Sequence, residues 1–491
     1  MAEHTGAPPV TGPGGPCPQR ITLISASMGA GHDGAATELA RHLTAAGFLI
    51  DRHDFLDLLP AGTGRLLCGA YHQLLTWAPA GYQHIYAATE HTRRPGPAIR
   101  ALLRSTQRRT LAAVTPDTRA VVSTYPGASQ VLGALRQRGR LIIPALTYLT
   151  DFSVHSLWVA PGIDAHLAAH PIPAAQAHAQ GAAAVTVTGP MTDPRFTPAT
   201  ADDRRAARAR FALPHDTPLA LLVAGSWGVG PVREAAAEIL ATRLALPVVV
   251  CGRNQALADR LRAEGIVHVH GWVEDMPGLM HACDVLVQNA GGLTSLEALA
   301  SGLPVASYRC IPGHGQTNAA ALDEAGLASW IREPDQLAPT LTELLHGPRG
   351  RSQRAAGLAL LSSAPGPVQA VTALAAGRLP AAHSGVHAPA AVHPAALPHP
   401  VPVRLPAPRD PAATDPDAQP HPAARRPVTP RRPRPVRPAG APRPARRRMT
   451  RMAVAVAATV SLGIAPLAHA LSEDPSLHLS AFAHYLEDDD R

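Results

Sequence analysis

The feature that most restricts the fold of this chain is a strand, a glycine-rich turn and a helix that follow one another twice. Residues 21–25 (ITLIS) read as a buried strand, and the turn SASMGAGH leads into a helix with apolar spacing over 33–47. The same order returns with the strand 219–224, the turn GSWGVG and the helix 232–242. A doubly wound parallel sheet begins in this way. The sequence therefore predicts an α/β fold with two Rossmann-like domains that face each other across a cleft.

The remaining strand-like segments divide between these two domains. A second strand over 49–55 completes the first β–α–β unit, and polar residues with several prolines over 192–217 connect the two halves. We expect a disordered N-terminus over 1–19, a first domain over 20–195 and a second domain over 196–379. The other expected strands are 120–124, 141–149, 185–188, 247–251, 267–270, 284–288 and 304–307.

The residues beyond the second domain have a composition that cannot form a core. The segment 380–450 holds 19 of the chain's 51 prolines and is rich in arginine, so we expect a disordered, extended linker. Residues 452–471 are 20 uncharged residues, which suits a bilayer, with arginines before them and a short acidic tail, 472–491, after them. This order predicts a single-pass anchor whose arginine side stays in the cytoplasm. The alternatives are a relic of a signal sequence and a translation artefact at a gene boundary.

The charge of the chain excludes several classes of function. Its formal net charge is +8, but the linker carries most of it, and residues 1–379 have a net charge of only +3. The chain contains no lysine, which excludes a Schiff-base lysine and the lysine of a P-loop. No basic face with aromatic platforms is visible in the sequence, so we expect no nucleic-acid partner.

The first candidate site is the turn that joins the strand 21–25 to its helix. Gly29 and Gly31 let the backbone approach a ligand, and the free N–H groups at the start of the helix favour an anion. His32 stands at the mouth of this turn, where it can take a proton near neutral pH. The alternative is a histidine that only caps the helix or forms a structural hydrogen bond.

Asp151, His155 and Trp158 form the second candidate group, at the end of the expected strand 141–149. Ligands meet doubly wound sheets where the strands end, so we expect Asp151 at the cleft. An ordinary loop around a buried tryptophan is the alternative. The histidines of HSLWVAPGIDAH lack metal-ligand spacing and the chain has no CxxC pair, so we predict no metal site.

The third candidate site is a glycine turn that opens a helix in NAGGLTSLEALASG. After Gly291 and Gly292, the backbone N–H groups, the hydroxyl of Thr294 and the helix dipole suit a diphosphate, with no lysine needed. Glu297 lies one turn into the helix, where a carboxylate can accept two hydrogen bonds from a ribose diol. A capping box with Thr294 is the alternative for Glu297. A polar cluster in which sugar hydroxyls could be read follows the next strand: His314, Gln316 and Asn318.

Several motifs of this chain resemble a known enzyme family. GSWGVGP, GWVEDMPGLMHACDVLVQNAGGLTSLEALASGLP and PGHGQTNAAAL resemble the donor half of GT-B glycosyltransferases. The branch that they resemble makes monogalactosyldiacylglycerol and related glucosyl-diacylglycerols, and is a relative of the lipid II-forming GlcNAc transferase. SASMGAGHDGAA and LTDFSVHSLWVAPGID resemble the N-terminal glycine-rich loop and the middle motif of that branch. The resemblance covers about residues 20–345.

The resemblance implies a role for each matching residue. The donor UDP-sugar would be bound at its diphosphate by Gly291, Gly292, Thr294, Ser226 and Gly228, at its ribose by Glu297, at its uracil by the backbone near Val273, and at its hexose by His314, Gln316 and Asn318. His32 would be the acceptor-side base or orienter. The other acceptor-side residues would be Gly29, Gly31, Asp151, His155 and Trp158. Members of the family often have two acidic residues where this chain has His314-Gly315-Gln316, and this departure leaves the donor hexose open.

Together these features predict an inverting, metal-independent hexosyltransferase that moves a hexose from a UDP-sugar to a lipid such as diacylglycerol and needs no cofactor. We expect it at the cytoplasmic face of the cell membrane. The lipid acceptor would enter over the helical stretch 65–91, and the partner would be a membrane surface with anionic lipid. This stretch carries several aromatic residues, and the arginines near it are Arg93, Arg94, Arg100, Arg104, Arg108 and Arg109. An ordinary core helix is the alternative for that stretch. Two other functions fit the same sequence: a UDP-sugar 2-epimerase of the same fold, and a catalytically inactive, membrane-tethered UDP-sugar-binding protein.

Overall fold

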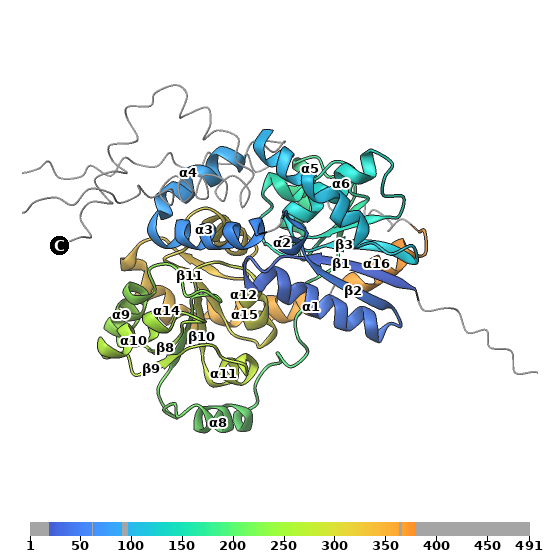
Figure 1. Cartoon of the computed structure of the whole chain (residues 1–491). Helices are drawn as coiled ribbons and strands as arrows, with labels where there is room; N and C mark the ends of the chain where they lie inside the picture. The colour runs from blue at the N-terminus through green and yellow to red at the C-terminus, as the bar shows by residue number, and fades with distance from the viewer. Residues whose placement is uncertain (1–18, 61, 91–96, 363–365, 379–491) are drawn as a thin grey trace, which may run out of the picture. The chain divides into compact units, whose positions relative to one another are not determined.

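The computed structural model describes residues 19–60, 62–90, 97–362 and 366–378, which form two parallel sheets with helices on both faces (Figure 1). In this part of the chain the first sheet has the strand order β2-β1-β3-β4-β5-β6. Its strands are β1 Arg20–Ser25, β2 Leu49–Asp54, β3 Thr118–Ser123, β4 Ala145–Tyr148, β5 Ala165–Ala168 and β6 Val185–Val187. The direction of winding reverses between β1 and β3, which is where doubly wound sheets bind ligands.

The second sheet repeats this arrangement with the order β12-β11-β10-β7-β8-β9. Its strands are β7 Leu219–Val223, β8 Leu246–Val250, β9 His268–His270, β10 Val285–Gln288, β11 Val305–Tyr308 and β12 Ser329–Ile331. Here the winding reverses between β7 and β10. The periodicity of the sequence predicted parallel sheets in two Rossmann-like halves, and the strand orders of both sheets agree with this prediction.

Helices cover both faces of each sheet, and this explains why the central strands are apolar throughout rather than alternating. In β7, Leu219 and Leu221 face one buried cluster, while Ala220 and Leu222 face the other. Strands buried on both sides are typical of all-parallel sheets. The helices are α1 Ala30–Ala45, α2 Phe55–Leu58, α3 Thr63–Trp77, α4 Pro79–Glu90, α5 Pro97–Ala112, α6 Pro126–Gln137, α7 Pro171–Ala179, α8 Ala201–Arg210, α9 Val232–Thr242, α10 Gln255–Ala263, α11 Met276–Ala282, α12 Leu293–Ala300, α13 His314–Glu324, α14 Leu337–Leu345, α15 Pro348–Ser362 and α16 Pro367–Ala375, with short 3-10 turns at Ser156–Trp158 and Pro334–Gln336.

Some expected strands have different limits in the structure. The strand expected over 141–149 is only Ala145–Tyr148, because Pro144 before it has no N–H to add to the ladder. The strand expected over 49–55 ends at Asp54, whose carboxylate accepts a hydrogen bond from the Leu56 N–H and so starts a helix. Two short strands, β5 and β12, were not expected from the sequence.

The helical stretch expected over 65–91 consists of two helices. α3 ends at Trp77, and α4 begins at Pro79. Proline is tolerated at the first position of a helix but not in its interior, so Pro79 starts a new helix. The two helices therefore pack as a hairpin, which we call the α3–α4 hairpin (Thr63–Glu90).

The last described helix returns to the first sheet. Val371 and Leu374 of α16 are buried in the same cluster as Ile21 and Leu39 of the first half, and Figure 1 shows α16 beside β1 and β3. The sequence placed residues up to 379 in the second domain, and for α16 this assignment is wrong. Sequence order is a poor guide here, because an amphipathic helix packs on whichever open sheet face it can reach.

The predicted membrane anchor, 452–471, lies outside the described residues, as do the linker 380–450, the acidic tail 472–491 and residues 1–18. Within the described residues, the stretch Pro348–Ala375 is long and apolar enough to cross a membrane by length and composition. This is weak evidence, because core helices meet the same criterion, and Val371 and Leu374 of this stretch are buried in the first domain.

Loss of the Leu374 side chain, which packs α16 on the first sheet, should destabilise the first domain. Leu374 is 2% exposed, so Leu374→Ala leaves a cavity and should lower the free energy of unfolding by about 2–5 kcal/mol. Leu358→Ala on α15 is the matched control, since Leu358 is 38% exposed and its loss should change stability by about 0.5 kcal/mol or less. Urea unfolding measures both, and equal effects would show that α16 does not pack on the first sheet.

Candidate active site

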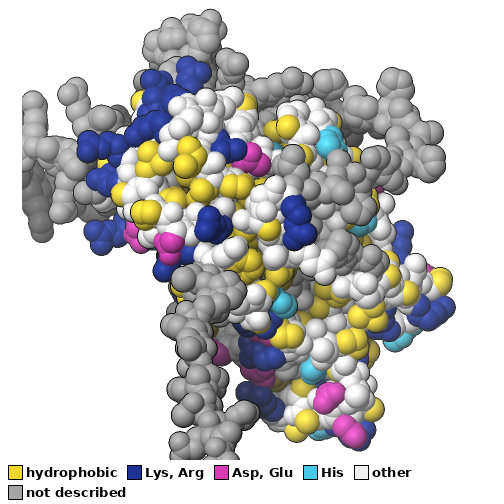
Figure 2. Space-filling view, turned by 90° about the vertical axis from the view of Figure 1, so that its right-hand side faces the viewer, with side chains coloured by type: hydrophobic (Ala, Val, Ile, Leu, Met, Phe, Trp, Pro, Cys, Tyr) yellow, Lys and Arg dark blue, Asp and Glu magenta, His cyan; other side chains and the backbone are white. Residues whose placement is uncertain are grey.

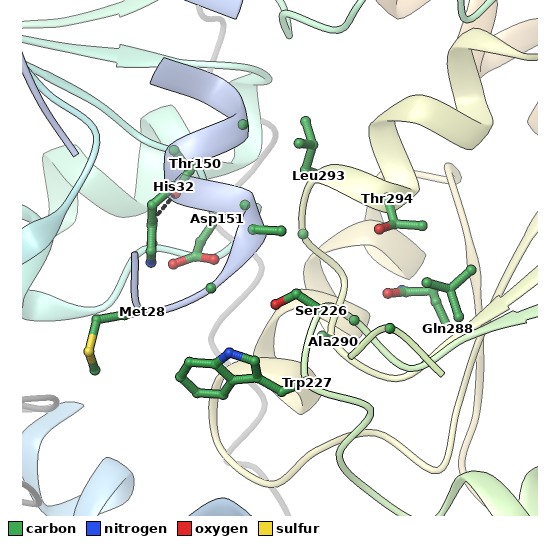
Figure 3. A pocket seen from close by; sticks show the side chains of 18 of the residues that line it. Met28, His32, Thr150, Asp151, Ser226, Trp227, Gln288, Ala290, Leu293 and Thr294 are labelled. Carbon is green, nitrogen blue, oxygen red and sulfur yellow. Dashed lines mark hydrogen bonds between the residues drawn. The ribbon is translucent and has the colours of Figure 1, made fainter. Parts of the chain in front are cut away.

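One cavity of about 530 Å³ lies at the carboxyl ends of both sheets, and both halves of the chain line it (Figure 3). From the first half come the start of α1 and the loop after β4. From the second half come the loops after β7 and β10, the first turn of α12 and the start of α13. This is the position at which α/β sheets of this kind bind ligands.

Most of the candidate residues from the sequence line this cavity. Those from the first half are Gly29, Gly31, His32, Asp151, His155 and Trp158, and those from the second half are Ser226, Val273, Gly292, Thr294, Glu297 and His314. Figure 3 shows His32 and Asp151 on one side of the cavity, with Ser226 and Thr294 on the other. Residues more than a hundred positions apart are thus brought to a single cavity.

Four candidate residues do not line the cavity: Gly228, Gly291, Gln316 and Asn318. Gly291 has a φ of +75°, and a Cβ there would lie 2.7 Å from Cβ of Asn318, so this position requires glycine for its turn. Asn318 is buried, with its Oδ1 accepting from the Ser153 N–H at 2.7 Å and its Nδ2 donating to the Ala290 carbonyl at 3.2 Å. Gly291 and Asn318 therefore support the turn before α12 without lining the cavity.

His32 lies at the start of α1 and is held from β4. Its Nδ1 is 2.8 Å from Oγ1 of Thr150, a contact drawn in Figure 3, and its ring lies against Tyr125 and Trp158. The residue that caps α1 is Gly29, with no side-chain cap, so His32 is not a capping residue. Burial lowers the pKa of His32, and the charge of Asp151 opposes this effect.

Asp151 is anchored by the tryptophan that follows it. The indole N–H of Trp158 donates to Oδ2 of Asp151 at 3.1 Å, and Trp158 itself is fully buried. His155 has both ring nitrogens in use: Nδ1 accepts from the Leu157 N–H, and Nε2 is 3.1 Å from Oγ1 of Thr89. The other oxygen, Oδ1 of Asp151, accepts from Nδ2 of Asn318 at 3.5 Å, so Asp151 links this loop to the second half at the cavity, and His155 holds the loop against α4.

The first turn of α12 presents backbone N–H groups to the cavity. The helix begins at Leu293 with Gly292 as its N-cap, and no side chain caps it. The hydroxyls of Thr294 and Ser226 lie on the same wall. Uncapped N–H groups together with the helix dipole favour an anion at this position.

Glu297 lines the cavity one turn further along α12. Because the N-cap is Gly292, Glu297 does not form a capping box with Thr294, and no described residue donates a hydrogen bond to its carboxylate. Burial raises the pKa of Glu297 to about 7, with smaller contributions from Asp193 and Glu38. A partly buried carboxylate to which no described residue donates can accept hydrogen bonds from a ligand.

The α3–α4 hairpin packs against the second half of the chain. Tyr82 and Tyr86 are buried in a cluster with Val229 and Ile311, and the hydroxyl of Tyr82 is 2.9 Å from Nδ1 of His314. The sequence assigned these aromatic residues to a lipid-facing surface, and for the two tyrosines this is wrong. Their spacing of four residues shows that they share one helix face, but not which partner that face meets.

Other apolar and basic side chains of the first half are exposed to solvent. Trp77 and Leu66 on α3 are 75% and 61% exposed. Since the chain has no lysine, the dark-blue side chains in Figure 2 are arginines, and they gather in the upper part of that view next to hydrophobic groups. The exposed arginines of α5 are Arg100, Arg104, Arg108 and Arg109. Arg93 and Arg94 lie outside the described residues.

The described part of the chain contains no group of three or more His, Cys, Asp or Glu side chains that could hold a metal ion. The cavity offers an anion uncapped N–H groups and hydroxyls in place of a cation. Its second-half wall therefore favours an anion, and its first-half wall carries a histidine that can take a proton.

Both halves of the chain match known families. Residues 32–190 match the family of monogalactosyldiacylglycerol (MGDG) synthase, and residues 224–346 match that of glycosyl transferases group 1. These matches confirm the resemblance to the diacylglycerol glycosyltransferase branch that the motifs indicated.

Among curated proteins, the chain is similar to two named processive diacylglycerol beta-glucosyltransferase. The one from Bacillus pumilus (strain SAFR-032) is 30% identical over 234 residues, and the one from Bacillus subtilis (strain 168) is 28% identical over 233 residues. Each match covers 46% of this chain and 60% of the relative, so the chain spans about three fifths of the length of these relatives.

Among solved structures, the crystal structure of the glycotransferase of kitacinnamycin is similar, with 16% sequence identity and a TM-score of 0.50. The match covers 74% of this chain and all of that protein. At this identity the likeness concerns the fold alone, and the two parallel-sheet domains are consistent with the GT-B arrangement.

The raised pKa of Glu297 predicts how stability changes with pH. Its ordinary value is 4.5, so the protonated group stabilises the ligand-free fold below pH 4.5, and this contribution is lost as the pH rises to about 7. Glu297→Gln stays neutral, so its melting temperature relative to the wild type should rise between pH 5 and pH 8. Glu274→Gln, an exposed glutamate on the same cavity, should show no such rise. Parallel melting curves for all three proteins would contradict the burial of the Glu297 carboxylate.

Proposed function

Because residues 32–190 match the monogalactosyldiacylglycerol (MGDG) synthase family and residues 224–346 match glycosyl transferases group 1, we propose that this protein moves a hexose from a UDP-sugar to a lipid acceptor such as diacylglycerol. The observation that carries the proposal is the single cavity in which His32 faces the uncapped start of α12. One wall thus has a group that can accept a proton, and the other has groups that can hold a nucleotide. A transfer reaction between two substrates needs both walls at once.

The second half would bind the donor. The N–H groups of the first turn of α12, with the hydroxyls of Thr294 and Ser226, would neutralise the diphosphate. Glu297 would accept hydrogen bonds from the ribose diol, and the backbone at Val273 would contact the uracil. Gly228 and Gly291 would contribute by letting the backbone turn closely around the ligand.

The first half would bind the acceptor and remove its proton. The acceptor hydroxyl attacks the anomeric carbon from the side opposite to UDP, the bond from that carbon to the phosphate oxygen breaks, and the configuration inverts. The hydroxyl proton passes to Nε2 of His32, while Nδ1 stays bonded to Thr150. Asp151 stabilises the imidazolium that forms. The negative charge on the leaving UDP is held by the α12 N–H groups, so the step needs no metal ion.

The acceptor is expected to come from a membrane. The exposed Trp77 and Leu66 on α3 and the exposed arginines of α5 are the groups that would contact anionic lipid at the cytoplasmic face. The predicted anchor at 452–471 would hold the enzyme at the same surface, and it stays a prediction.

A radiolabelled transfer assay tests the proposed function. The full-length protein is incubated with UDP-glucose, UDP-galactose or UDP-GlcNAc and with diacylglycerol in anionic vesicles, in excess EDTA. Label in the lipid supports the proposal. Free epimerised sugar would indicate a 2-epimerase, and binding without turnover would indicate an inactive binding protein. Loss of transfer in EDTA, restored by magnesium or manganese, would overturn the metal-independent mechanism.

Glu297→Ala should weaken UDP binding. Hydrogen bonds to a charged group contribute about 1.5–3 kcal/mol, so the dissociation constant should rise roughly tenfold to a hundredfold. Isothermal titration calorimetry measures the change, with Glu274→Ala on the same cavity as the control. An unchanged affinity in a folded Glu297→Ala variant would contradict the ribose role.

His32→Ala should abolish most turnover while UDP affinity stays the same. General base catalysis contributes about a hundredfold to ten-thousandfold to a rate, and His32 lies on the acceptor wall. Steady-state transfer rates and UDP calorimetry on the same preparation separate the two effects. Intact turnover would make His32 structural, and a parallel loss of UDP affinity would show that the first wall also binds the donor.

A further inference from the structure

The contact between the two halves contains a hydrogen bond that the proposed reaction does not yet use. The hydroxyl of Tyr82, on α4 in the first half, is 2.9 Å from Nδ1 of His314, the first residue of α13 in the second half. The two rings meet edge to face at 5.9 Å. One turn further along both helices, the hydroxyl of Tyr86 is 3.1 Å from Oγ1 of Thr317.

The backbone of the turn before His314 packs closely against the rings of Tyr82 and Tyr86. Gly313 has a φ of +71°, and a Cβ there would lie 2.8 Å from Tyr86 and 2.9 Å from Tyr82. Glycine is therefore required both for the backbone conformation and for the close approach. As a result, the start of α13 has its position set by α4.

His314 faces the cavity and has one ring nitrogen to offer. It lines the cavity wall, and its Nε2 has no hydrogen-bond partner among the described residues. The motif resemblance implied that the donor hexose is bound by His314, Gln316 and Asn318, and of these three residues His314 is the one that lines the cavity. Nε2 is thus free to form a hydrogen bond with a hydroxyl of the sugar.

Both partners of the bond are neutral near pH 7. Burial lowers the pKa of His314, against the opposing effect of Asp151 and with a smaller lowering effect from His32, and burial raises the pKa of Tyr82 well above 10. A neutral imidazole carries a single N–H. If Tyr82 donates to Nδ1, Nε2 carries the hydrogen and donates to the sugar; if Nδ1 donates to Tyr82, Nε2 accepts. The partner at Nδ1 therefore decides what Nε2 can recognise.

We propose that Tyr82 is a positioning residue for His314, which orients the imidazole and sets whether Nε2 donates to or accepts from the donor hexose. This inference rests on the proposed function. Its consequence is that a residue of the first, acceptor-binding half takes part in selecting the sugar bound by the second half.

Tyr82→Phe tests the proposal, because it keeps the ring and removes only the hydroxyl. Dissociation constants for UDP, UDP-glucose and UDP-galactose are measured by calorimetry on the full-length protein. Glucose and galactose differ only in the orientation of one hydroxyl, so the ratio of their constants reports hexose selection. We expect Tyr82→Phe to change this ratio about twofold to tenfold, the usual range for one neutral hydrogen bond, with the UDP constant changed less than about twofold.

Two further variants make the test specific. His314→Ala should change the ratio as Tyr82→Phe does, and the double variant should add nothing, because the two residues act through one bond. Tyr86→Phe is the matched control: it removes a hydroxyl from the same interface but not from His314, and it should leave the ratio unchanged.

The contrary outcomes are distinct. If Tyr82→Phe leaves the ratio unchanged, whether or not it weakens the binding of UDP and both UDP-sugars, the hydroxyl only holds the interface together and the proposal is wrong. Additive effects of Tyr82→Phe and His314→Ala would also overturn it. A wild-type protein that does not bind UDP at all would contradict the proposed function itself, and the inference with it.

Discussion

The site depends on a constraint that parallel sheets impose on their helices. Every strand of a parallel sheet ends at the same edge, and the helix that follows begins there with N–H groups that have no partner within the helix. At α1 and α12 the N-cap residues are Gly29 and Gly292, and neither helix has a side-chain cap. Two such edges meet at one cavity, which leaves the N–H groups of α12 for a ligand and places a histidine on the opposite wall.

The sequence predicted the fold wherever glycine and apolar runs marked a change of element. The helix Val232–Thr242 has the expected limits, because a glycine turn precedes it and a buried strand follows it closely. Ala165–Ala168 was missed because its alanines have weak strand preference, and the strand over 141–149 was extended too far because Pro144 was not weighed. α16 could not be placed from sequence, because nothing local shows which of two similar sheets it covers.

The candidate site was predictable to the extent that its residues follow strand ends. His32, Asp151 and Glu297 line the cavity because each lies just after a strand and its turn. The roles of Tyr82 and His314 toward each other could not be foreseen, since 232 residues separate them and only the packed interface brings them together. In the same way, the sequence could not show that both ring nitrogens of His155 form hydrogen bonds within the fold.

The return of α16 to the first sheet changes how the two halves are joined. The chain crosses to the second half after β6 and crosses back after α15, so the second half is an insertion held at both of its ends. A body attached at two points has lost free rotation about a single flexible linker, and its easiest movement is a swing about the line through both attachments. Opening and closing of the cavity would then follow one axis. A swing about this axis that opened the cavity would have to break the contact between Tyr82 and His314, so this contact across the two halves would resist opening.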